Sequence, residues 1–355
     1  MTESLEDTEI VAPHFKRRLS GVTSSIIQLV PAQRQHGDNV ATIGPGLPDW
    51  LPHLPLSALF KLWRPPRHRA LRIWHARRNI EMLPGIVMRD LLRMKLALLF
   101  TSAAQRRHSS WTRFLIRRMD AVVATSARSG SFLEVPHRVI RHGIDLTRFS
   151  PPASPDDDMA ATGLPGRHLI GCFGRIRHQK GTDLFVDAMI ALLPHYPDWT
   201  AILCGRITPE HAAFGDELKA RIAAAGLSER ILFLGEVEDV RPWYRRLSLY
   251  VAPSRNEGFG LTPLEAMASQ TATVASDAGA YAELIVDGET GAVVPAGDGS
   301  ALTQAIEPYL ADPARAAAHG LNGLAHVRTH FAIEREAAAL SDVYAALFDR
   351  RPVVD

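Results

Sequence analysis

The sequence predicts an α/β protein of two domains, each built around an open parallel sheet with helices on both faces. Its length of 355 residues exceeds one ordinary core and suits two domains of typical size. In the second half, short apolar runs alternate with segments of helical spacing, as in parallel sheets. A stretch rich in Pro, Asp, Gly and Ala, 149–166, separates the halves, and we expect it to link the two domains.

The second domain is expected to span residues 161–334 and has the more regular pattern. Ligands of such sheets bind beyond the carboxyl ends of the strands, so we expect a site on the loops that follow them. The predicted strands are 169–176, 200–205, 231–237, 247–254, 271–277 and 292–297. The predicted helices are 183–193, 217–227 and 262–270.

The first domain, expected at 1–160, is less regular. A loop feeding a helix is predicted at 20–37, and the predicted strands are 39–44, 71–77, 96–102 and 121–127. The final helix, 332–349, has no partner that the sequence identifies, and the segment 335–355 could complete the first domain. The two parallel sheets are expected to face each other across a cleft.

Composition places the chain among soluble globular proteins, with 46% hydrophobic and 22% charged residues. The acidic first ten residues do not form a secretory signal, and no run approaches the roughly 18 apolar residues that span a bilayer. Cys172 and Cys204 lie in apolar runs, which favours buried, reduced thiols over a disulfide. These features predict a cytoplasmic protein.

Charge is distributed unevenly behind a net value of +2. Residues 1–150 hold 23 Lys and Arg against 11 Asp and Glu, whereas residues 151–355 hold 17 against 27. The basic half favours an anionic partner, which could be a membrane surface, a phosphorylated lipid or an acidic sugar. Nucleic acid is disfavoured because no recognised nucleic-acid motif is present. Alternatively, the two halves simply attract one another.

The segment Glu257–Glu265 (EGFGLTPLE) follows a predicted strand and opens a predicted helix. Its glycines let backbone amides approach a ligand closely, and Thr262-Pro263 suits a helix start, where proline costs no hydrogen bond. A helix start favours phosphate, and Glu265 in the first turn can accept hydrogen bonds from paired hydroxyls, as on a ribose. On spacing alone, the glycines could equally form a turn and Glu265 could serve only the helix dipole.

Arg175 and Lys180 lie on the predicted loop between a strand and a helix, in GCFGRIRHQKGTDLF. Two cations near glycines at a strand's carboxyl end suit a diphosphate, Arg as a planar fork and Lys as a point charge. They can neutralise the charge that develops on a leaving nucleotide diphosphate. Taken alone, a pair of loop cations is more often a solvated surface.

These two segments and ELIVDGETGAVVPAGD (283–298) together resemble the C-terminal domain of family 4 retaining glycosyltransferases of GT-B fold, over about 165–300. The family pattern of Arg and Lys on the first loop and Glu-x7-Glu on the later one is intact. The resemblance implies that Arg175 and Lys180 bind the donor diphosphate, that Glu257 contacts the donor sugar and that Glu265 holds the ribose. It further implies donor contacts from Gly258, Phe259, Gly260 and Leu261, and a base pocket lined by Val237 and its neighbours.

The first half resembles the same family more loosely. Gly21 and Val22, in a segment similar to the family's first glycine loop, are implied to approach the donor phosphate or the acceptor. His142 stands where the family usually has Asn. The family often has a site histidine at the end of a strand, but here that position falls at Ser102 or Ala103. The candidates on the acceptor side are therefore His75, Arg77, Ser102 and Arg106, and for His75 a role in packing alone is an equal alternative.

Over its full length the sequence is similar to alpha-proteobacterial lipopolysaccharide core mannosyltransferases. The segments HFKRRLSGVTS, WHARRN, FTSAAQRRH, RRMDAVVATS and RSGSFLEVPH carry this resemblance. It implies transfer from GDP-mannose to a Kdo-containing inner-core lipid, with neither a metal nor another cofactor and with retention by front-face attack. Two other functions stay open, a sugar-nucleotide epimerase or hydrolase on the same scaffold and a non-catalytic module that binds anionic glycolipid.

Arginines interleave with aromatic and aliphatic residues in KLWRPPRHRALRIWHARR and RRHSSWTRFLIRRM. A helix through the second segment would group Trp111, Phe114 and Leu115 near one stripe, flanked by arginines. Such a helix suits docking on an anionic interface, which would place the protein peripherally on the cytoplasmic face of the inner membrane. The alternative is an ordinary amphipathic helix that packs Trp111 and Phe114 into the domain core.

Overall fold

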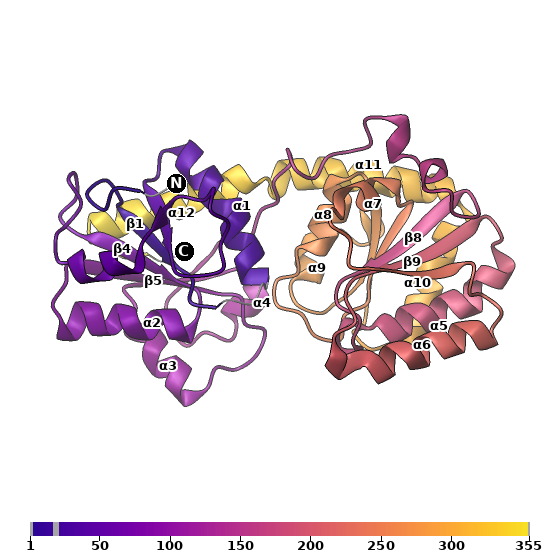
Figure 1. The fold of residues 1–355 in the computed structure, drawn as a ribbon, viewed down its shortest axis with the longest axis horizontal. Coiled ribbons are helices and arrows are strands. Elements are labelled where there is room, and N and C mark those ends of the chain that lie inside the picture. The colour runs from indigo at the N-terminus through magenta and orange to yellow at the C-terminus, as the bar shows by residue number, and fades with distance from the viewer. Residues whose placement is uncertain (1–2, 17–20, 354–355) are drawn as a thin grey trace. The chain divides into compact units, whose positions relative to one another are not determined.

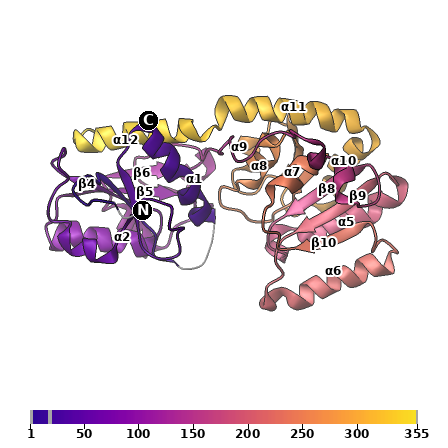
Figure 2. The same cartoon turned by 45° about the horizontal axis from the view of Figure 1, so that its top comes forward.

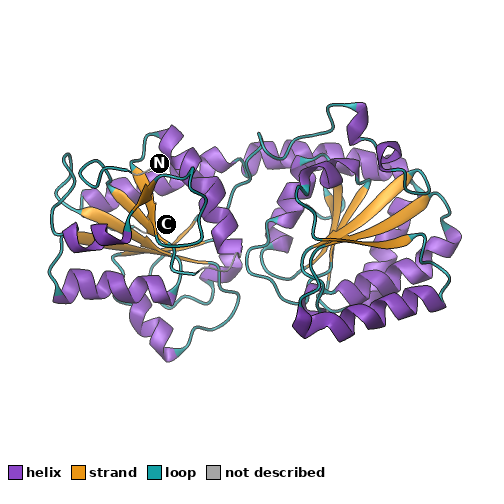
Figure 3. Ribbon diagram, in the orientation of Figure 1, coloured by secondary structure: helices purple, strands orange, loops and turns teal. Residues whose placement is uncertain are grey.

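The computed structural model describes residues 3–16 and 21–353 of the protein. The chain divides into two compact units: unit 1 comprises Met1–Gly143 with Phe331–Asp355, and unit 2 comprises Ile144–His330. Each unit holds one sheet with helices packed on it (Figures 1 and 3). Every strand pairing in both sheets is parallel, so the predicted α/β class with two parallel sheets is confirmed.

Unit 1 has, within the described residues, a sheet of seven strands in the order β3-β2-β1-β4-β5-β6-β7. The sequence did not indicate β1, β3 or β7, which are only two to four residues long and show no usable periodicity. The strands are β1 (Ile10–Pro13), β2 (Val40–Ile43), β3 (His53–Leu54), β4 (Arg72–Ala76), β5 (Leu96–Ser102), β6 (Ala121–Ala124) and β7 (Arg138–Val139). The helical segments are α1 (Gly21–His36), η1 (Leu56–Lys61), α2 (Asn79–Ile86), η2 (Val87–Leu91), α3 (Ser110–Ile116), α4 (Ala127–Gly130) and α12 (Ile333–Phe348).

Unit 2 has a six-stranded sheet in the order β10-β9-β8-β11-β12-β13. All the strands and helices predicted for this half are present, because their apolar runs are longer and more clearly separated. The strands are β8 (His168–Phe173), β9 (Trp199–Cys204), β10 (Ile231–Gly235), β11 (Leu249–Ala252), β12 (Ala272–Ser276) and β13 (Gly291–Val294). The α-helices are α5 (Thr182–Leu192), α6 (Ala212–Ala224), α7 (Arg241–Arg246), α8 (Thr262–Ala268), α9 (Tyr281–Leu284), α10 (Gly299–Ala311) and α11 (Pro313–His330). The short helical turns are η3 (Pro155–Asp157), η4 (Met159–Thr162), η5 (His178–Lys180), η6 (Leu193–His195) and η7 (Pro209–His211).

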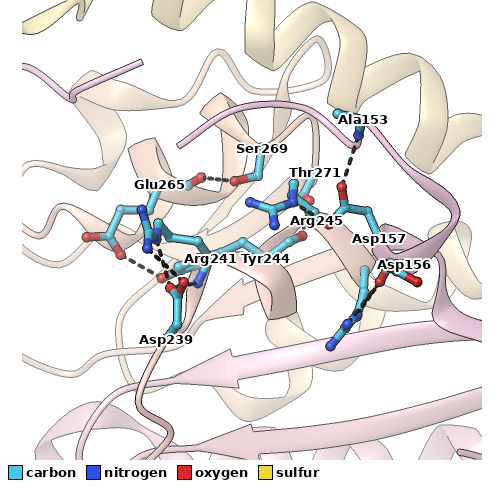
Figure 4. A network of polar contacts seen from close by, with 11 residues as sticks. Ala153, Asp156, Asp157, Asp239, Arg241, Tyr244, Arg245, Glu265, Ser269 and Thr271 are labelled. Carbon is cyan, nitrogen blue, oxygen red and sulfur yellow. Dashed lines mark hydrogen bonds and ion pairs between the residues drawn. The ribbon is translucent and has the colours of Figure 1, made fainter. Parts of the chain in front are cut away.

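The boundary between the units falls after Gly143 and not at residue 160. The expected linker 149–166 belongs to unit 2, where the Asp157 carboxylate accepts a 2.5 Å hydrogen bond from Arg245 Nε on α7 (Figure 4). The Phe149 ring meets the Tyr244 ring edge to face, with centroids 6.0 Å apart. These contacts explain the difference, because a segment rich in Pro and Asp can still pack when its carboxylates have arginine partners.

The last helix, α12, packs on unit 1 against α1 and β4 (Figure 2). Its buried side chains recur every three or four residues, which is the pattern of a helix with one face in a core. Gly143 permits the approach of its first turn, because a Cβ there would lie 2.5 Å from Ile333 Cα. The chain returns from unit 2 to unit 1 between His330 and Phe331, close to the expected domain boundary between residues 334 and 335.

Polar groups within this core fix the position of α12. Tyr344, 1% exposed, accepts a 2.7 Å hydrogen bond from Gln33 Nε2, and its hydroxyl lies 2.8 Å from His75 Nδ1. Glu336 accepts a 2.8 Å hydrogen bond from the Gly143 amide and lies 2.7 Å from His142 Nδ1. A buried polar group gains stability only when it is paired, so these contacts specify where the helix docks.

Two further sequence expectations concern the cysteines and the membrane. Cys172 and Cys204 are free, buried thiols, as predicted, and burial raises the pKa of Cys172 to about 12. Within residues 3–16 and 21–353, no helix combines the length and apolar character needed to cross a bilayer.

Tyr344→Phe should destabilise the protein by about 1–3 kcal/mol, because it leaves the buried Gln33 amide and the His75 ring without their shared partner. Tyr196→Phe is the matched control, since its hydroxyl makes only an exposed 3.2 Å hydrogen bond to Glu307. The measurement is the urea midpoint of unfolding. Equal midpoints for the two variants would show that the Tyr344 hydroxyl does not anchor α12.

Candidate active site

The candidate site lies at the carboxyl ends of two neighbouring parallel strands of unit 2, β8 and β11. The strand order reverses between them, since β9 and β10 lie on one side and β12 and β13 on the other. Such a switch point opens a crevice, because the loops that leave the two strands run in opposite directions. The loop after β8 carries Arg175 and Lys180, and the loop after β11 carries Glu257.

The two loops are joined by an ion pair in which Lys180 Nζ donates to Glu257 Oε2. Both side chains are about four-fifths buried, with 20% and 19% of their surfaces exposed. Glu257 also accepts a 3.1 Å hydrogen bond from the Gly258 amide and a 3.4 Å one from the Tyr281 hydroxyl. Burial by itself would raise the pKa of Glu257, but the charge of Lys180 and these hydrogen bonds outweigh it and lower the pKa.

Two glycines make this close approach possible. Gly181 has a left-handed φ of +67°, and a Cβ there would lie 1.9 Å from the Pro253 carbonyl oxygen on the other loop. Gly260 has a φ of +85°, and a Cβ there would lie 2.2 Å from the Tyr281 ring and 2.9 Å from Glu257 Cγ. Only glycine fits both the backbone conformation and the available space.

Arg255 joins the same two loops at a second point. Sequence reasoning did not identify it as part of the site. Its guanidinium donates two 2.7 Å hydrogen bonds to Asp183 at the start of α5 and one of 2.8 Å to the His178 carbonyl. Its backbone amide donates to the Gln179 carbonyl at 2.9 Å. Its position two residues before Glu257 was the only available signal, because Asp183 gives no pattern with it in the sequence.

Glu265 lies in the first turn of α8, as predicted, and is held by a 2.8 Å hydrogen bond from the Tyr244 hydroxyl to its Oε2 (Figure 4). Burial raises the pKa of Glu265, although the Tyr244 hydroxyl and the charges of Arg148 and Lys180 oppose the rise. Oε1 accepts no hydrogen bond from a described residue. One carboxylate oxygen is therefore fixed and the other is available.

Arg175 differs from Lys180 in having no hydrogen bond or ion pair to any residue that the structure describes. Its side chain is half-buried at the end of β8. A half-buried guanidinium without a protein carboxylate is suited to an anionic ligand.

The remaining predicted donor residues occupy the same edge of the sheet but differ in exposure. Phe259 is 4% exposed, so its ring is buried in the core. Gly258 and Leu261 are half-buried. Val237 lies on the loop that follows β10, close to Cys204 at the end of β9.

The candidate residues of unit 1 do not form one cluster. His75, 1% exposed, lies between Tyr344 and Thr101, whose Oγ1 is 2.7 Å from His75 Nε2, and burial holds its pKa well below the usual range. Arg77, 9% exposed, donates a 3.3 Å hydrogen bond to the His75 carbonyl. Arg77, His75, His142 and Glu336 line one internal cavity.

Ser102, Arg106 and the first glycine loop lie elsewhere in unit 1. Ser102 is buried, with its Oγ 3.4 Å from His108 Nε2, and it points to the opposite face of β5 from Thr101. Arg106 is exposed. Gly21 is exposed with open space around it and begins α1, followed by half-buried Val22, while residues 17–20 of that loop lie outside the described residues.

A metal site was not expected from the sequence. In the described part of the chain, no group of three or more His, Cys, Asp and Glu side chains is placed to hold a metal ion.

The fold and site define a glycosyltransferase of GT-B fold. Residues 167–312 match the family of glycosyl transferases group 1, and the chain belongs to this family. Its high-identity relatives identify it as a hexosyltransferase. Along its length it is similar to the lipopolysaccharide core biosynthesis mannosyltransferase LpcC of Rhizobium leguminosarum bv. viciae, with 69% identity over 343 residues and 97% of each chain covered. It is 56% identical to the lipopolysaccharide core biosynthesis mannosyltransferase LpsB of Rhizobium meliloti strain 1021, over 97% of this chain and 99% of that one.

A solved structure supports the fold over both units. The crystal structure of Alr3699/HepE from Anabaena in complex with UDP and glucose matches 96% of this chain and 100% of its own, with a TM-score of 0.80. The sequences are 18% identical, so this similarity concerns the fold alone.

Lys180→Met should lower stability by roughly 3 kcal/mol at pH 7, because Glu257 then stays buried without its cation. The wild-type pair contributes stability above the ordinary glutamate pKa of 4.5, and this contribution is lost as pH falls through the lowered pKa of folded Glu257. In the variant, burial raises the pKa of Glu257, so its carboxyl group is protonated near pH 4. The free-energy cost of burying an unpaired carboxylate then disappears. The difference in urea midpoint between wild type and variant should therefore narrow from pH 7 to pH 4.

Lys219→Met provides the control, since the Lys219–Asp216 pair is exposed at 3.9 Å. The urea midpoints of Lys219→Met and wild type should differ little at both pH 7 and pH 4. A Lys180→Met difference that stays constant or widens on acidification would contradict the assigned coupling.

Proposed function

We propose that the protein transfers mannose from GDP-mannose to the Kdo region of the lipopolysaccharide inner core, with retention of configuration and without a metal. The observation that carries the proposal is the Lys180–Glu257 pair beside a partner-free Arg175 at the switch point of unit 2. The choice of mannose and of the lipopolysaccharide core is supported by similarity to two proteins with that name over nearly the whole chain.

On the donor side, Arg175 and Lys180 bind the diphosphate. Breaking the bond between the sugar C1 and the phosphate oxygen leaves negative charge on the departing diphosphate, which these cations stabilise. Lys180 is already positioned by Glu257, so little reorganisation is needed when the diphosphate arrives. The departing phosphate oxygen accepts the proton of the attacking acceptor hydroxyl, so the step needs no protein nucleophile.

The sugar and the nucleoside are held by the neighbouring carboxylates. Glu257 and the Gly258–Leu261 backbone contact the mannose hydroxyls. The free Oε1 of Glu265 accepts hydrogen bonds from the ribose, while Tyr244 keeps Oε2 in place. Val237 lines the base pocket from the loop after β10.

The acceptor is assigned to unit 1, which holds the excess of basic residues. Arg77, Ser102 and Arg106 are the acceptor-side candidates, and phosphates or carboxylates of the inner core would suit the charge of the two arginines. Gly21 and Val22, at the start of α1, keep the expected role of approaching the donor phosphate or the acceptor. His75 is enclosed by Thr101 and Tyr344, which supports a positioning role in place of contact with a sugar. A cytoplasmic enzyme at the inner face of the membrane fits such an acceptor.

Arg175→Ala should lower the transfer rate by about a hundredfold or more, because one positioned cation on the leaving group is lost. Its stability should match that of wild type, since the Arg175 side chain has no partner among the described residues. Arg167→Ala is the matched control, because Arg167 is exposed and precedes the same strand, β8, at its other end. Equal transfer rates for both variants would overturn the assignment of Arg175.

A panel of nucleotide sugars, assayed with a lipid A–Kdo acceptor and analysed by mass, tests the reaction itself. The expected product is the acceptor plus one hexose, formed with GDP-mannose and dependent on the acceptor. Free mannose or an epimer without acceptor would indicate a hydrolase or epimerase. Failure to bind any nucleotide would favour a glycolipid-binding module.

A further inference from the structure

An ion pair between Arg255 and Asp183 connects the loop after β11 to the first turn of α5. Arg255 Nη1 and Nη2 each donate a 2.7 Å hydrogen bond to one oxygen of the Asp183 carboxylate. Two parallel bonds of this kind fix the orientation of both groups, unlike a single contact between point charges. The side chains are 23% and 16% exposed, so water screens the pair only in part.

This pair is complete without a ligand. Both oxygens of Asp183 accept from Arg255, and Arg255 Nη1 also donates a 2.8 Å hydrogen bond to the His178 carbonyl. Burial by itself would raise the pKa of Asp183, but the hydrogen bonds and the charge of Arg255 outweigh it and lower the pKa. Arg175, by contrast, has no hydrogen bond or ion pair to any described residue. Arg175 is therefore suited to a ligand, and Arg255 is suited to holding the protein in place.

Arg255 contacts the chain on both sides of Lys180. Before Lys180, the His178 carbonyl accepts from the guanidinium, and the Gln179 carbonyl accepts from the Arg255 amide at 2.9 Å. After Lys180, the contact is with Asp183 at the start of α5. Lys180 itself ends the single turn η5, which lies between these contacts. Arg255 thus fixes the point at which the Lys180 side chain leaves the backbone.

The Lys180–Glu257 pair joins the same loops, but its two groups are also those expected to bind the donor. A diphosphate bound to Lys180 would compete with Glu257 for the ammonium group, and a sugar hydroxyl bound to Glu257 would compete for the carboxylate. The link through this pair would then weaken while the donor occupies the site. The Arg255–Asp183 pair involves neither group, so it can hold the loops together throughout the reaction.

We propose that Arg255 is a positioning residue for sugar transfer, which holds Lys180 in place for the leaving diphosphate. Negative charge on the leaving group grows as the bond between sugar and phosphate breaks, so a displaced cation costs most at that stage. A displacement of about 1 Å can lower a rate about a hundredfold. This role rests on the proposed function, because it takes Lys180 as a ligand of the donor diphosphate.

An ion pair that only stabilises unit 2 is the alternative to a positioning role. The loss of such a pair would affect the protein equally whether or not Lys180 is present. A positioning residue acts through Lys180, so its loss should have little effect once Lys180 is gone. A double-mutant cycle on Arg255 and Lys180 separates the two roles.

The test is the affinity of the full-length protein for GDP, measured by isothermal titration calorimetry. GDP carries the charge that the leaving group acquires, so its binding depends on Lys180 and needs no acceptor. Arg255→Ala should weaken GDP binding about tenfold. In a Lys180→Met background, the same substitution should weaken it less than about twofold, because the cation that Arg255 positions is absent.

Arg255→Lys should recover part of the lost affinity and bind GDP about threefold more weakly than wild type. A lysine keeps a charge opposite Asp183 but cannot hold both carboxylate oxygens and the His178 carbonyl. Arg221→Ala is the matched control, because Arg221 forms an ion pair with Asp187, one turn further along the same helix, α5. This control should bind GDP as wild type does, and circular dichroism checks that every variant is folded.

Equal losses in the two backgrounds would overturn the proposal in favour of a purely structural ion pair. Arg255→Ala that binds GDP as tightly as the Arg221→Ala control would also overturn it. Wild type that binds no nucleoside diphosphate would refute the proposed function itself, and the role of Arg255 with it. If wild type prefers UDP or ADP, the donor assignment changes and the same cycle is decided with that nucleotide.

Discussion

The Lys180–Glu257 ion pair is the contact on which the site of unit 2 depends. It joins loops from two adjacent strands at the point where the sheet reverses its order, and it holds two opposite charges in partial burial. Neither charge is stable there without the other, so the sequence around the pair is constrained. Gly181 and Gly260 give the loops room to meet, and Arg255 fastens them through Asp183. Arg175 remains without a protein partner, in a site that is otherwise already assembled.

Unit 1 depends on a different constraint, the return of the chain's last helix. α12 brings Tyr344 and Glu336 into a core whose other polar members are His75, Gln33 and His142. Removal of that helix would leave several buried groups unpaired and expose the part of the core that it shares with α1. Unit 1 is therefore complete only when residues 331–353 have been added. His75 pairs with the Tyr344 hydroxyl and so helps to anchor α12, which explains why a histidine is buried at the end of β4.

The charge asymmetry of the sequence is concentrated in one part of unit 1. Residues 56–120 hold 15 Lys and Arg against three Asp and Glu. The structure shows where this part of the chain lies, because Gly85 packs on Trp74 and holds α2 so that Ile80 and Leu83 face solvent.

The sequence by itself determined the two parallel sheets and the strands and helices of unit 2, and the similarity of the whole chain to glycosyltransferases agrees with this fold. It also predicted Arg175, Lys180, Glu257 and Glu265 as site residues. These predictions follow from local features, namely periodic apolar runs and glycine loops at strand ends. Only the tertiary structure decided that 149–166 belongs to unit 2, that His75 is enclosed, and that Trp111 and Phe114 face solvent. Each of these depends on a partner distant in sequence, such as Arg245 for Asp157 or Tyr344 for His75. Such pairings leave no local pattern, because burial is set by elements that meet only after folding.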